Sequence, residues 1–391
     1  MVLTIRRVRS RADLDEFIRV PRQLYAGMKG YAPPLDYERR QLLDPRKSPF
    51  FTHGYAAYWI ASCGGRAVGR ISAQIDFLAV GEDAGRTGLF GCLDTIDDGD
   101  VVAQLLQSAE AWLRRENRSI VRGPFLLSIN GEPGMLIEGY QEDPVVMLAW
   151  HPRYLRQHLQ DRGYAIAMPL HCFVMDAARF ASGNELAAAA VLRSRAGLTV
   201  RDLRLDDLDH DMELGRRMFN NGWKDNWGFT PASETDVRAL ARQFKPFLSP
   251  KSGFFIEARG EPAAFVLAIP NTSEITADLG GAPSLIGWSK LLFRVWRKRY
   301  RRYRLVLIGI SSRYRDSVLG AAIGSLAFAE VWQRGQDQGI EQGVAGWIAE
   351  NNRQTMRAVR SFGFQYTRSY AIFEKHLHAP AGQAAHGHLQ R

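Results

Sequence analysis

The feature that most constrains the fold of this chain is residues 305–326, where an apolar strand runs into a short basic turn and then into an apolar helix. Leu305 to Ile310 is predicted to be a buried strand, Ser311 to Asp316 the turn, and Val318 the start of a small-residue helix. A helix that follows a strand directly points unpaired backbone N–H groups beyond the strand end, which favours an anion. The alternative is an ordinary strand-to-helix turn of an α/β protein.

The residues of this turn indicate which anion would bind. Arg313 and Arg315 flank the helix start, Ser317 offers a hydroxyl group, and Gly320 and Ala321 are small enough for a ligand to approach the backbone. A diphosphate is the ligand that this arrangement favours.

The segments after the turn resemble the GNAT (GCN5-related N-acetyltransferase) superfamily in order and spacing. A second apolar strand ends at Asn351 and Asn352, a helix spans residues 353–361, and Phe362-Gly363-Phe364 precedes a last strand. The resemblance implies that the turn holds the diphosphate of an acyl-CoA and that the two strands splay apart around the thioester. The residues it assigns to this cosubstrate are Ile310, Ser311, Ser312, Arg313, Arg315, Ser317, Leu319, Gly320, Ala321 and Asn352.

Two positions depart from the GNAT pattern. The turn reads Arg315-Asp316-Ser317-Val318-Leu319-Gly320, so only the second of two expected glycines is present. Val359 stands where the family often has a tyrosine that protonates the leaving thiolate. The sequence therefore leaves the general acid unassigned.

Internal similarity indicates a tandem duplication. Leu3-Thr4-Ile5-Arg6 returns as Leu198-Thr199-Val200-Arg201, a hairpin at residues 59–69 returns at 255–264, and Gly163-Tyr164 returns as Gly363-Phe364. The predicted fold class is α/β, with two GNAT-like domains that are each a mixed, mostly antiparallel sheet flanked by helices. The predicted boundaries are a degenerate domain at 1–180, a linking helix at 181–197, a cofactor-binding domain at 198–376 and a flexible tail at 377–391. Chance similarity of short apolar strings is the alternative.

The first copy is predicted not to bind the cofactor. Its equivalent turn, Thr95 to Asp100, is acidic and would repel a diphosphate. An insertion between residues 123 and 146 contains Ser128-Ile129-Asn130-Gly131-Glu132. Loops of this length are often functional, although a solvated surface loop is an equally good interpretation.

Composition limits the cellular setting. The formal net charge of +10 favours an anionic partner, and the chain has no secretory signal pattern and no apolar run of transmembrane length. Three widely spaced cysteines, Cys63, Cys92 and Cys172, favour a reducing cytoplasm without disulfides or a metal site.

The turn after the first helix of the second copy mixes aromatic and amide side chains. In the GNAT fold this position forms one side of the acceptor pocket, so the resemblance implies substrate contacts for Trp223, Asn226 and Trp227. Asn130 and Tyr370 complete the predicted substrate-binding set. The alternative is that the aromatic residues belong to the core.

Residues 283–304 form an insertion with a basic amphipathic pattern. Leu285, Trp288, Leu292, Val295 and Trp296 fall on one helical stripe, and residues 290–304 carry eight Lys or Arg and no Asp or Glu. This pattern is typical of a segment at an anionic membrane surface, with Arg297 and Lys298 among its cations. A nucleic-acid patch and a core-covering helix are alternatives, but no nucleic-acid-binding motif accompanies the charge.

Taken together, these landmarks resemble a bacterial group of tandem GNAT-like acyltransferases that includes ceramide synthases. The resemblance implies transfer of a fatty acyl group from acyl-CoA to the amine of a long-chain sphingoid base, by a cytoplasmic enzyme peripheral on the inner membrane. Acylation of another small or lipid amine, and a non-catalytic protein that binds lipid or acyl-CoA, are the alternatives.

The expected mechanism is direct transfer, because neither a G-x-S-x-G elbow nor a placed Cys–His pair occurs. Glu350, at the end of the second strand, is the candidate base for the acceptor ammonium, and Asn351 lies beside it. Backbone N–H groups around Ile310 and Ser311 are expected to polarise the thioester carbonyl.

Overall fold

The computed structural model describes residues 2–177, 191, 193–194, 196–315 and 317–377. The strands are β1 (Leu3–Arg7), β2 (Gly54–Cys63), β3 (Arg66–Asp76), β4 (Thr87–Thr95), β5 (Ile120–Gly123), β6 (Met135–Glu138), β7 (Ala165–Asp176), β8 (Leu198–Asp202), β9 (Gly253–Ala258), β10 (Glu261–Pro270), β11 (Arg302–Ile310), β12 (Gln342–Ala349) and β13 (Gln365–His376). The helices are α1 (Arg11–Leu24), α2 (Asp36–Leu43), α3 (Gly99–Arg115), α4 (Tyr154–Asp161), α6 (Leu208–Trp223), α7 (Glu234–Phe244), α8 (Ser273–Thr276), α9 (Leu285–Arg297), α10 (Val318–Asp337) and α11 (Arg353–Ser361).

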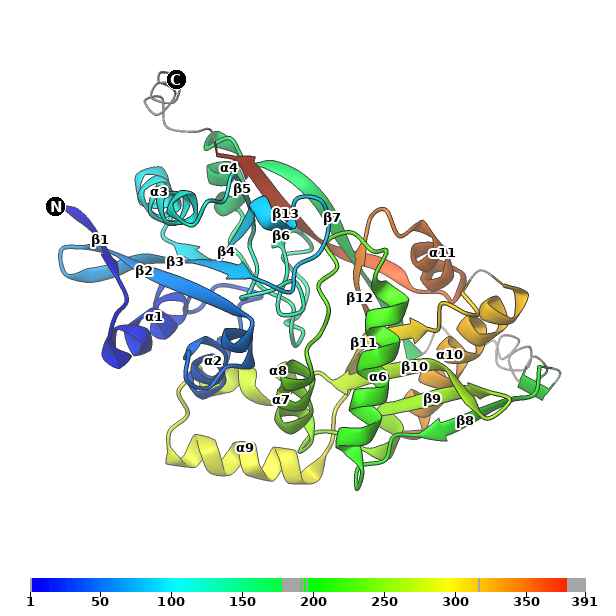
Figure 1. The fold of residues 1–391 in the computed structure, drawn as a ribbon. Coiled ribbons are helices and arrows are strands. Elements are labelled where there is room, and N and C mark those ends of the chain that lie inside the picture. Colours follow the sequence, from blue (N-terminus) through cyan, green and yellow to red (C-terminus); the bar gives the residue numbers. More distant parts are fainter. Residues whose placement is uncertain (1, 178–190, 192, 195, 316, 378–391) are drawn as a thin grey trace, which may run out of the picture.

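The strands form one continuous mixed sheet that runs through both halves of the molecule, in the order β1-β2-β3-β4-β5-β13-β7-β12-β11-β10-β9-β8, with β6 paired to β13. All of the pairings are antiparallel except β4 with β5 and β11 with β12. The first half, in blue and cyan, and the second half, in green to orange, lie on either side of β7 and β13 (Figure 1). The predicted α/β class with a mostly antiparallel sheet in each half is confirmed.

The internal sequence repeat corresponds to a repeat of strands and helices. The pair Leu3-Thr4-Ile5-Arg6 and Leu198-Thr199-Val200-Arg201 lies in β1 and β8, each at an outer edge of the sheet. The two similar hairpins are β2–β3 and β9–β10. Each hairpin precedes a strand, a helix and a parallel strand, β4-α3-β5 in one half and β11-α10-β12 in the other, and in the second half α8 and α9 lie between the hairpin and β11.

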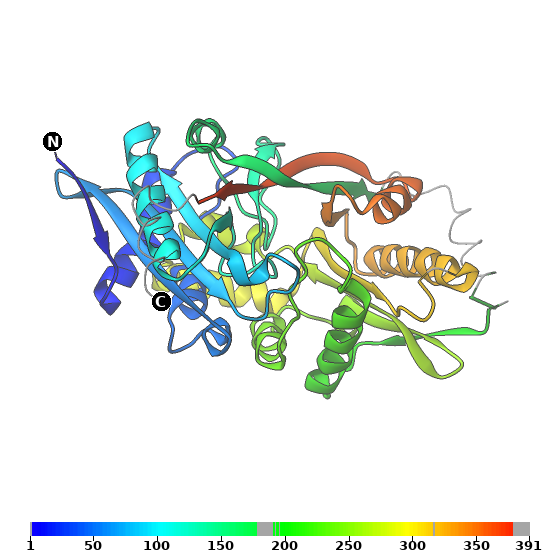
Figure 2. The ribbon, with the colours of Figure 1, turned by 45° about the horizontal axis from the view of Figure 1, so that its top comes forward.

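The final strands of the two halves are exchanged. β7 belongs to the first half by sequence but pairs with β12, whereas β13 belongs to the second half by sequence but pairs with β5. The two exchanged strands also pair with each other, with Leu170 opposite Tyr370 (Figure 2). A division of the sequence at the predicted boundaries therefore does not divide the sheet into two self-contained halves.

Helices cover both faces of each half. In the second half α10 and α11 pack on one face through Ile323, Leu326 and Val359, and α6 and α7 pack on the other through Met212 and Phe244. The alternation along β9 divides its side chains between these two cores, because successive strand residues point to opposite faces. α3 and α4 cover one face of the first half, and α1 covers the other.

Most of the predicted linking helix and tail lies outside the described residues. Residues 178–190, 192 and 195 of the linker region and residues 378–391 are not described.

Candidate functional site

A cavity lies between β11 and β12, where the two parallel strands separate. Only Arg302–Leu305 of β11 pairs with β12, and its partners there are Gln342–Ala345. Beyond Leu305 they diverge, and the space holds a cavity of about 160 Å³ with Val306, Leu307, Gly346 and Trp347 in its walls. The predicted splay of the two strands is therefore present, and we call this space the splay cavity.

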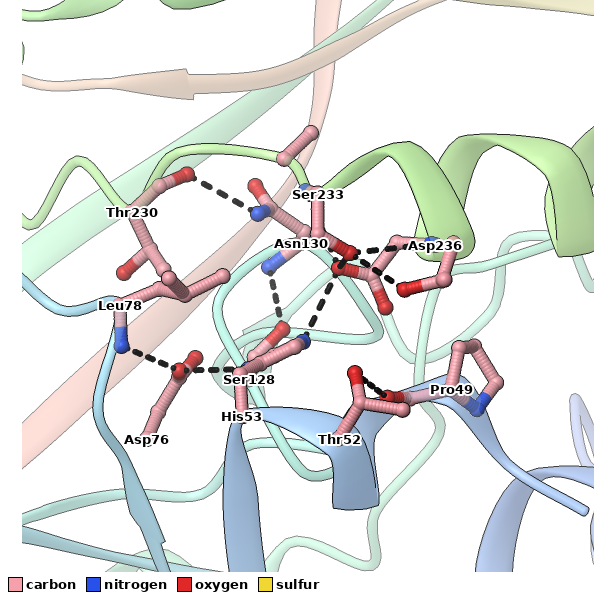
Figure 3. A network of polar contacts seen from close by, with 12 residues as sticks. Pro49, Thr52, His53, Asp76, Leu78, Ser128, Asn130, Thr230, Ser233 and Asp236 are labelled. Atoms are coloured by element: carbon pink, nitrogen blue, oxygen red, sulfur yellow. Dashed lines mark hydrogen bonds and ion pairs between the residues drawn. The ribbon is translucent and has the colours of Figure 1, made fainter.

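Four of the five predicted substrate residues line the splay cavity. Trp223, Asn226 and Trp227 come from the end of α6 and the turn after it, and Asn130 comes from the insertion of the first half. The Asn130 Nδ2 donates to the backbone oxygen of Thr230 at 3.0 Å, which fixes the two segments together (Figure 3). The first half thus builds one wall of a cavity that lies in the second half.

His53 strengthens the junction near this wall. Its Nδ1 lies 3.0 Å from Asp76 Oδ1, and its Nε2 lies 3.0 Å from Asp236 Oδ2 at the start of α7 (Figure 3). The Asp76 side chain is 1% exposed, so its carboxylate is held in the interior of the first half. The imidazole therefore ties the first half to α7 of the second half.

Arg304 forms the floor of the splay cavity. It is buried and donates from Nη1 to the backbone oxygen of Val146 at 2.8 Å and from Nη2 to that of Gly346 at 3.0 Å. Burial lowers the pKa of its guanidinium. This residue joins β11, β12 and the 144–151 segment of the first half.

The basic turn before α10 has the predicted position at the end of β11. Ser317 is the N-cap residue, and its Oγ accepts from the Gly320 N–H at 3.0 Å. Arg313 is paired with Glu261 at 2.8 Å, whereas Arg315 Nη1 is 3.6 Å from Asp225. The buried Nη2 of Arg315 has no hydrogen-bond partner among the residues that the structure describes. Arg315 is therefore the better placed of the two cations for an anionic ligand. Asp316 is outside the described residues.

Gly320 is required by the fold of the turn as well as by ligand access. A Cβ atom at this position would lie 2.0 Å from the backbone oxygen of Tyr314. The retained glycine of the GNAT pattern therefore allows the turn to pack against the first residues of α10. Ala321 and Leu319 follow it in the first turn of that helix.

The expectation that the Ser311 N–H polarises the thioester carbonyl is wrong. This group donates to the backbone oxygen of Ala263 at 2.9 Å, and the Ser312 N–H lies 3.3 Å from Asn221 Oδ1. A bulge deeper in β11 offers another donor. Leu305 lies opposite Ala268 and Leu307 opposite Leu267, so Val306 has no residue opposite it on β10.

The equivalent space in the first half is closed. A Cβ atom at Gly91 would lie 1.8 Å from the backbone oxygen of Phe125, and one at Gly123 would lie 2.3 Å from that of Phe90. The Phe125 N–H donates to the Phe90 oxygen at 2.8 Å, so the backbone after β5 fills the gap beside β4. The acidic turn is occupied as well, because Asp98 caps α3 and Asp97 pairs with His158 at 2.8 Å.

The remaining predicted site residues lie outside the splay cavity. Glu350 follows β12 with its side chain 60% exposed and one oxygen 3.8 Å from His171 Nε2. Asn351 is exposed beside it, and Asn352 caps α11 by accepting from the Thr355 N–H at 3.1 Å. Val359 is buried in the core, and its aliphatic side chain has no proton to donate, so it cannot replace the family tyrosine as an acid. Tyr370 is fully buried among the residues of β7 and β6. It does not line the splay cavity, so it does not contact a substrate bound there.

A second and larger cavity, of about 760 Å³, lies between the two halves. We call it the interdomain chamber. Its wall includes Tyr31, Glu38, Glu132, Trp150, Phe244 and Trp288. Met147 lines both the interdomain chamber and the splay cavity, so the two spaces meet at this side chain.

The basic insertion forms α9, which lies below α2, α7 and α8 in Figure 1. The phase of its predicted apolar stripe is partly wrong. Leu285 and Trp296 are 87% and 78% exposed and Leu292 is exposed too, but Val295 packs inward and Trp288 lines the interdomain chamber. Ile286 and Phe293, which were not predicted, complete the outward apolar face.

Ion pairs neutralise much of the charge of the insertion. Arg294 is bidentate to Asp278, Arg301 pairs with Glu341, and Arg302 pairs with Asp143. Lys298 donates to the Leu248 oxygen at 2.9 Å. Within the described part of the chain, no acidic partner is found for Arg297, Lys298 or Arg299, which cluster at the end of α9.

Comparisons with known proteins agree with this architecture. The chain is 33% identical over 379 residues to the bacterial ceramide synthase of Caulobacter vibrioides, covering 96% of this chain and 98% of that protein. This chain belongs to the same family, a family of tandem GNAT-like acyltransferases. The acyltransferase is also 32% identical over 378 residues to protein YghO of Escherichia coli, with 95% of each chain covered. No family model matches it.

Solved structures support the tandem fold of the acyltransferase. A tandem GNAT protein from the clavulanic acid biosynthesis pathway aligns over 97% of this chain and all of its own, with a TM-score of 0.57 and 12% identity. The glucosamine N-acetyltransferase region of a fungal multi-domain β-N-acetylglucosaminidase gives the same TM-score, with 38% of that chain covered. None of the helices described for the acyltransferase is long and apolar enough to cross a membrane.

Proposed function

We propose that this acyltransferase transfers a fatty acyl group from acyl-CoA to the amine of a long-chain sphingoid base. The observation that carries the proposal is the splay cavity, which opens between β11 and β12 at the end of the sheet where the basic turn and the start of α10 lie. The similarity to a bacterial ceramide synthase over nearly the whole chain supports the choice of substrates.

In this proposal the diphosphate of acyl-CoA binds at the start of α10. Arg315 supplies the cation, because one of its guanidinium nitrogens has no hydrogen-bond partner among the described residues, and the N–H groups of Val318 and Leu319 supply donors. The acyl-CoA is a cosubstrate and supplies the activated acyl group. The thioester then lies in the splay cavity between Val306 and Trp347.

The chain's own groups stabilise the transition state and accept the proton. The backbone N–H of Val306 at the bulge of β11 is the proposed donor to the thioester oxygen, since Val306 has no residue opposite it on β10. Glu350 is the proposed proton acceptor. Because it lies outside the cavity lining and is exposed, it takes the proton through water, with His171 beside it.

The acyltransferase meets its lipid substrate at the membrane through α9. The outward face of this helix carries Leu285, Ile286, Leu292, Phe293 and Trp296. Its end carries three cations that have no acidic partner among the described residues, namely Arg297, Lys298 and Arg299. A helix with an apolar face and flanking cations is suited to the interface of an anionic bilayer, where each cation contributes about 1 kcal/mol. In this proposal the acyltransferase is a cytoplasmic enzyme that is peripheral on the inner membrane.

The experiment that tests the function measures free CoA released from palmitoyl-CoA by the purified protein. We expect release to depend on an added long-chain sphingoid base and to yield an amide product that mass spectrometry detects. Equal release with short amines or amino acids would indicate a different acceptor. Binding of palmitoyl-CoA with no release for any amine would favour a non-catalytic binding protein.

A further inference from the structure

The interdomain chamber is far larger than the splay cavity and has a different lining. A cavity of about 150 Å³ holds a ring the size of benzene, whereas ligand sites are usually about 300–1,000 Å³. The splay cavity, of about 160 Å³, can therefore hold the reacting groups but not a long chain. The chamber, of about 760 Å³, is in the range for a whole small lipid.

Most of the chamber wall is apolar, and it extends to the surface beside α9. Proline, leucine and aromatic side chains come from the 31–35 segment, the 144–150 segment and the end of α7. Trp288 and Leu291 of α9 lie in the same wall, and the exposed Tyr37 and Arg242 lie at its rim. The helix with the outward apolar face therefore borders the chamber directly.

One group of charges in the chamber is unbalanced. Arg39 Nη2 lies 2.6 Å from Glu132 Oε1, and this pair is internally neutral. Glu38 lies close enough to both to interact electrostatically, but it accepts its hydrogen bond from the neutral amide of Gln243, at 3.1 Å. Two carboxylates thus share one guanidinium. Burial raises the pKa of Glu38, which is the expected effect when a carboxylate lacks a full counter-charge.

The same wall also contains buried polar atoms whose hydrogen bonding is incomplete. Arg368 is 5% exposed, and its Nε has no hydrogen-bond partner in the described part of the chain. The same holds, among the described residues, for Tyr31 Oη and Trp150 Nε1. Buried polar atoms are nearly always hydrogen-bonded in folded proteins, so these three atoms show that the polar groups behind this wall are not all satisfied by the described residues.

We infer that the interdomain chamber binds the long-chain amine, with its hydrocarbon chain along the apolar wall towards α9 and its ammonium group at Glu38 and Glu132. This inference rests on the proposed function for the identity of the acceptor. Glu132 follows Asn130 and Gly131 of the splay cavity, and Met147 separates the two spaces. The bound amine therefore lies next to the thioester, and the flexible Met147 side chain lies between the interdomain chamber and the splay cavity.

Photolabelling of the wild-type protein tests the location without requiring turnover. The probe is octadecylamine with a diazirine in its chain, and the matched probe is stearic acid with the same diazirine. We expect the amine probe to label residues 31–43, 144–151 and 285–291, and the acid probe to label them much less. Labelling confined to residues 223–230, or equal labelling by both probes, would overturn the inference. Labelling of the chamber by a diazirine-bearing stearoyl-CoA would overturn it as well, because the acyl chain would then occupy the space.

Two variants test the head and the chain separately. Glu38→Gln should raise the KM for octadecylamine at least tenfold without changing the KM for stearoyl-CoA, because an amide does not balance an ammonium charge. Ala239→Phe adds bulk at the chamber wall and should lower kcat/KM for octadecylamine at least tenfold while sparing octylamine. Glu82→Gln, a change at an exposed carboxylate outside both cavities, is the control.

The outcomes separate this inference from the proposed function. Thermal unfolding of each variant must match that of the wild type, or exceed it, for a kinetic change to be assigned to the chamber. Unchanged KM values in Glu38→Gln together with unchanged chain-length preference in Ala239→Phe would overturn the inference. If the wild type releases no CoA with either amine, the proposed function fails, and the photolabelling still decides where the amine binds.

Discussion

Asn130 of the first half donates to the backbone oxygen of Thr230 of the second half at 3.0 Å, across the wall of the splay cavity. Loss of this hydrogen bond should free the 128–132 loop from the turn after α6. We expect Asn130→Ala to lower kcat/KM for acyl transfer about fivefold to tenfold, because a net hydrogen bond contributes about 1 kcal/mol. Initial rates of CoA release measure the effect. Asn130→Asp keeps the size but removes the donor, so a normal rate in that variant would show that the hydrogen bond is not the cause.

Arg315 is the second residue whose replacement should be informative. Arg315→Glu should weaken acyl-CoA binding about tenfold to a hundredfold, because hydrogen bonds to charged groups contribute about 1.5–3 kcal/mol. Calorimetric titration with palmitoyl-CoA measures this. The matched reversal in the first half, Asp97→Lys, should leave the affinity unchanged, since that turn is filled by its own side chains. Equal losses of affinity in the two variants would show that acyl-CoA has been assigned to the wrong half.

Glu350→Gln tests the proton acceptor. Removal of a general base should lower turnover by about two to four orders of magnitude while the affinity for acyl-CoA stays constant. The deficit should shrink as the pH rises, because more of the amine is then already neutral. Asn351→Ala, one residue further along, should have a smaller effect on turnover. Near-normal turnover of Glu350→Gln at neutral pH would assign the proton to another group.

The outward face of α9 can be tested by flotation with vesicles. Leu292→Ser combined with Trp296→Ser should reduce binding to anionic vesicles, and Arg297→Glu combined with Arg299→Glu should remove the dependence of binding on salt. The control is Phe77→Ser with Val80→Ser, since both residues are exposed and belong to the first half. Activity on a soluble short-chain amine should be retained in all of these variants. Flotation equal to that of the wild type would mean that α9 does not contact the membrane.

Glu38 should also influence stability in a pH-dependent way. Burial raises its pKa above the ordinary value of 4.5, so the folded state binds this proton more tightly than the unfolded state. The free energy of unfolding contributed by this group therefore falls as the pH rises from about 4.5 through the folded-state pKa. We expect Glu38→Gln to be more stable than the wild type towards urea at pH 7 and to lose that advantage near pH 4.5. A variant that is less stable at pH 7 would contradict this interpretation.

The sequence predicted the parts of this enzyme that depend on local patterns. A local apolar pattern predicts each of these elements without reference to its neighbours in space. They are the strand at residues 305–310, the helix from Val318 and the repeated hairpins. The aromatic turn around Trp223 and Trp227 could likewise be assigned to a cavity wall from its composition and its place in the fold.

Features that depend on distant partners could not be predicted. The residues of β7 and of β13 indicate that each segment is a strand, but they do not indicate which half each strand completes. α9 is apolar on two sides, and only its neighbours determine that Leu291 and Val295 face inward. The ion pairs of Arg294, Arg301 and Arg302 use acids from three other segments, and the interdomain chamber is lined by both halves.

The position of β13 has a consequence for synthesis of the chain on the ribosome. Residues 365–376 are translated after both helical layers and nearly all of the sheet, yet they occupy its centre between β5 and β7. Until they emerge, β5 is paired only with β4 and its other side is an open sheet edge, which is a site for pairing with other chains. The first half therefore cannot complete its sheet before the second half is translated. A chain that ends before residue 365 has two incomplete halves rather than one folded domain.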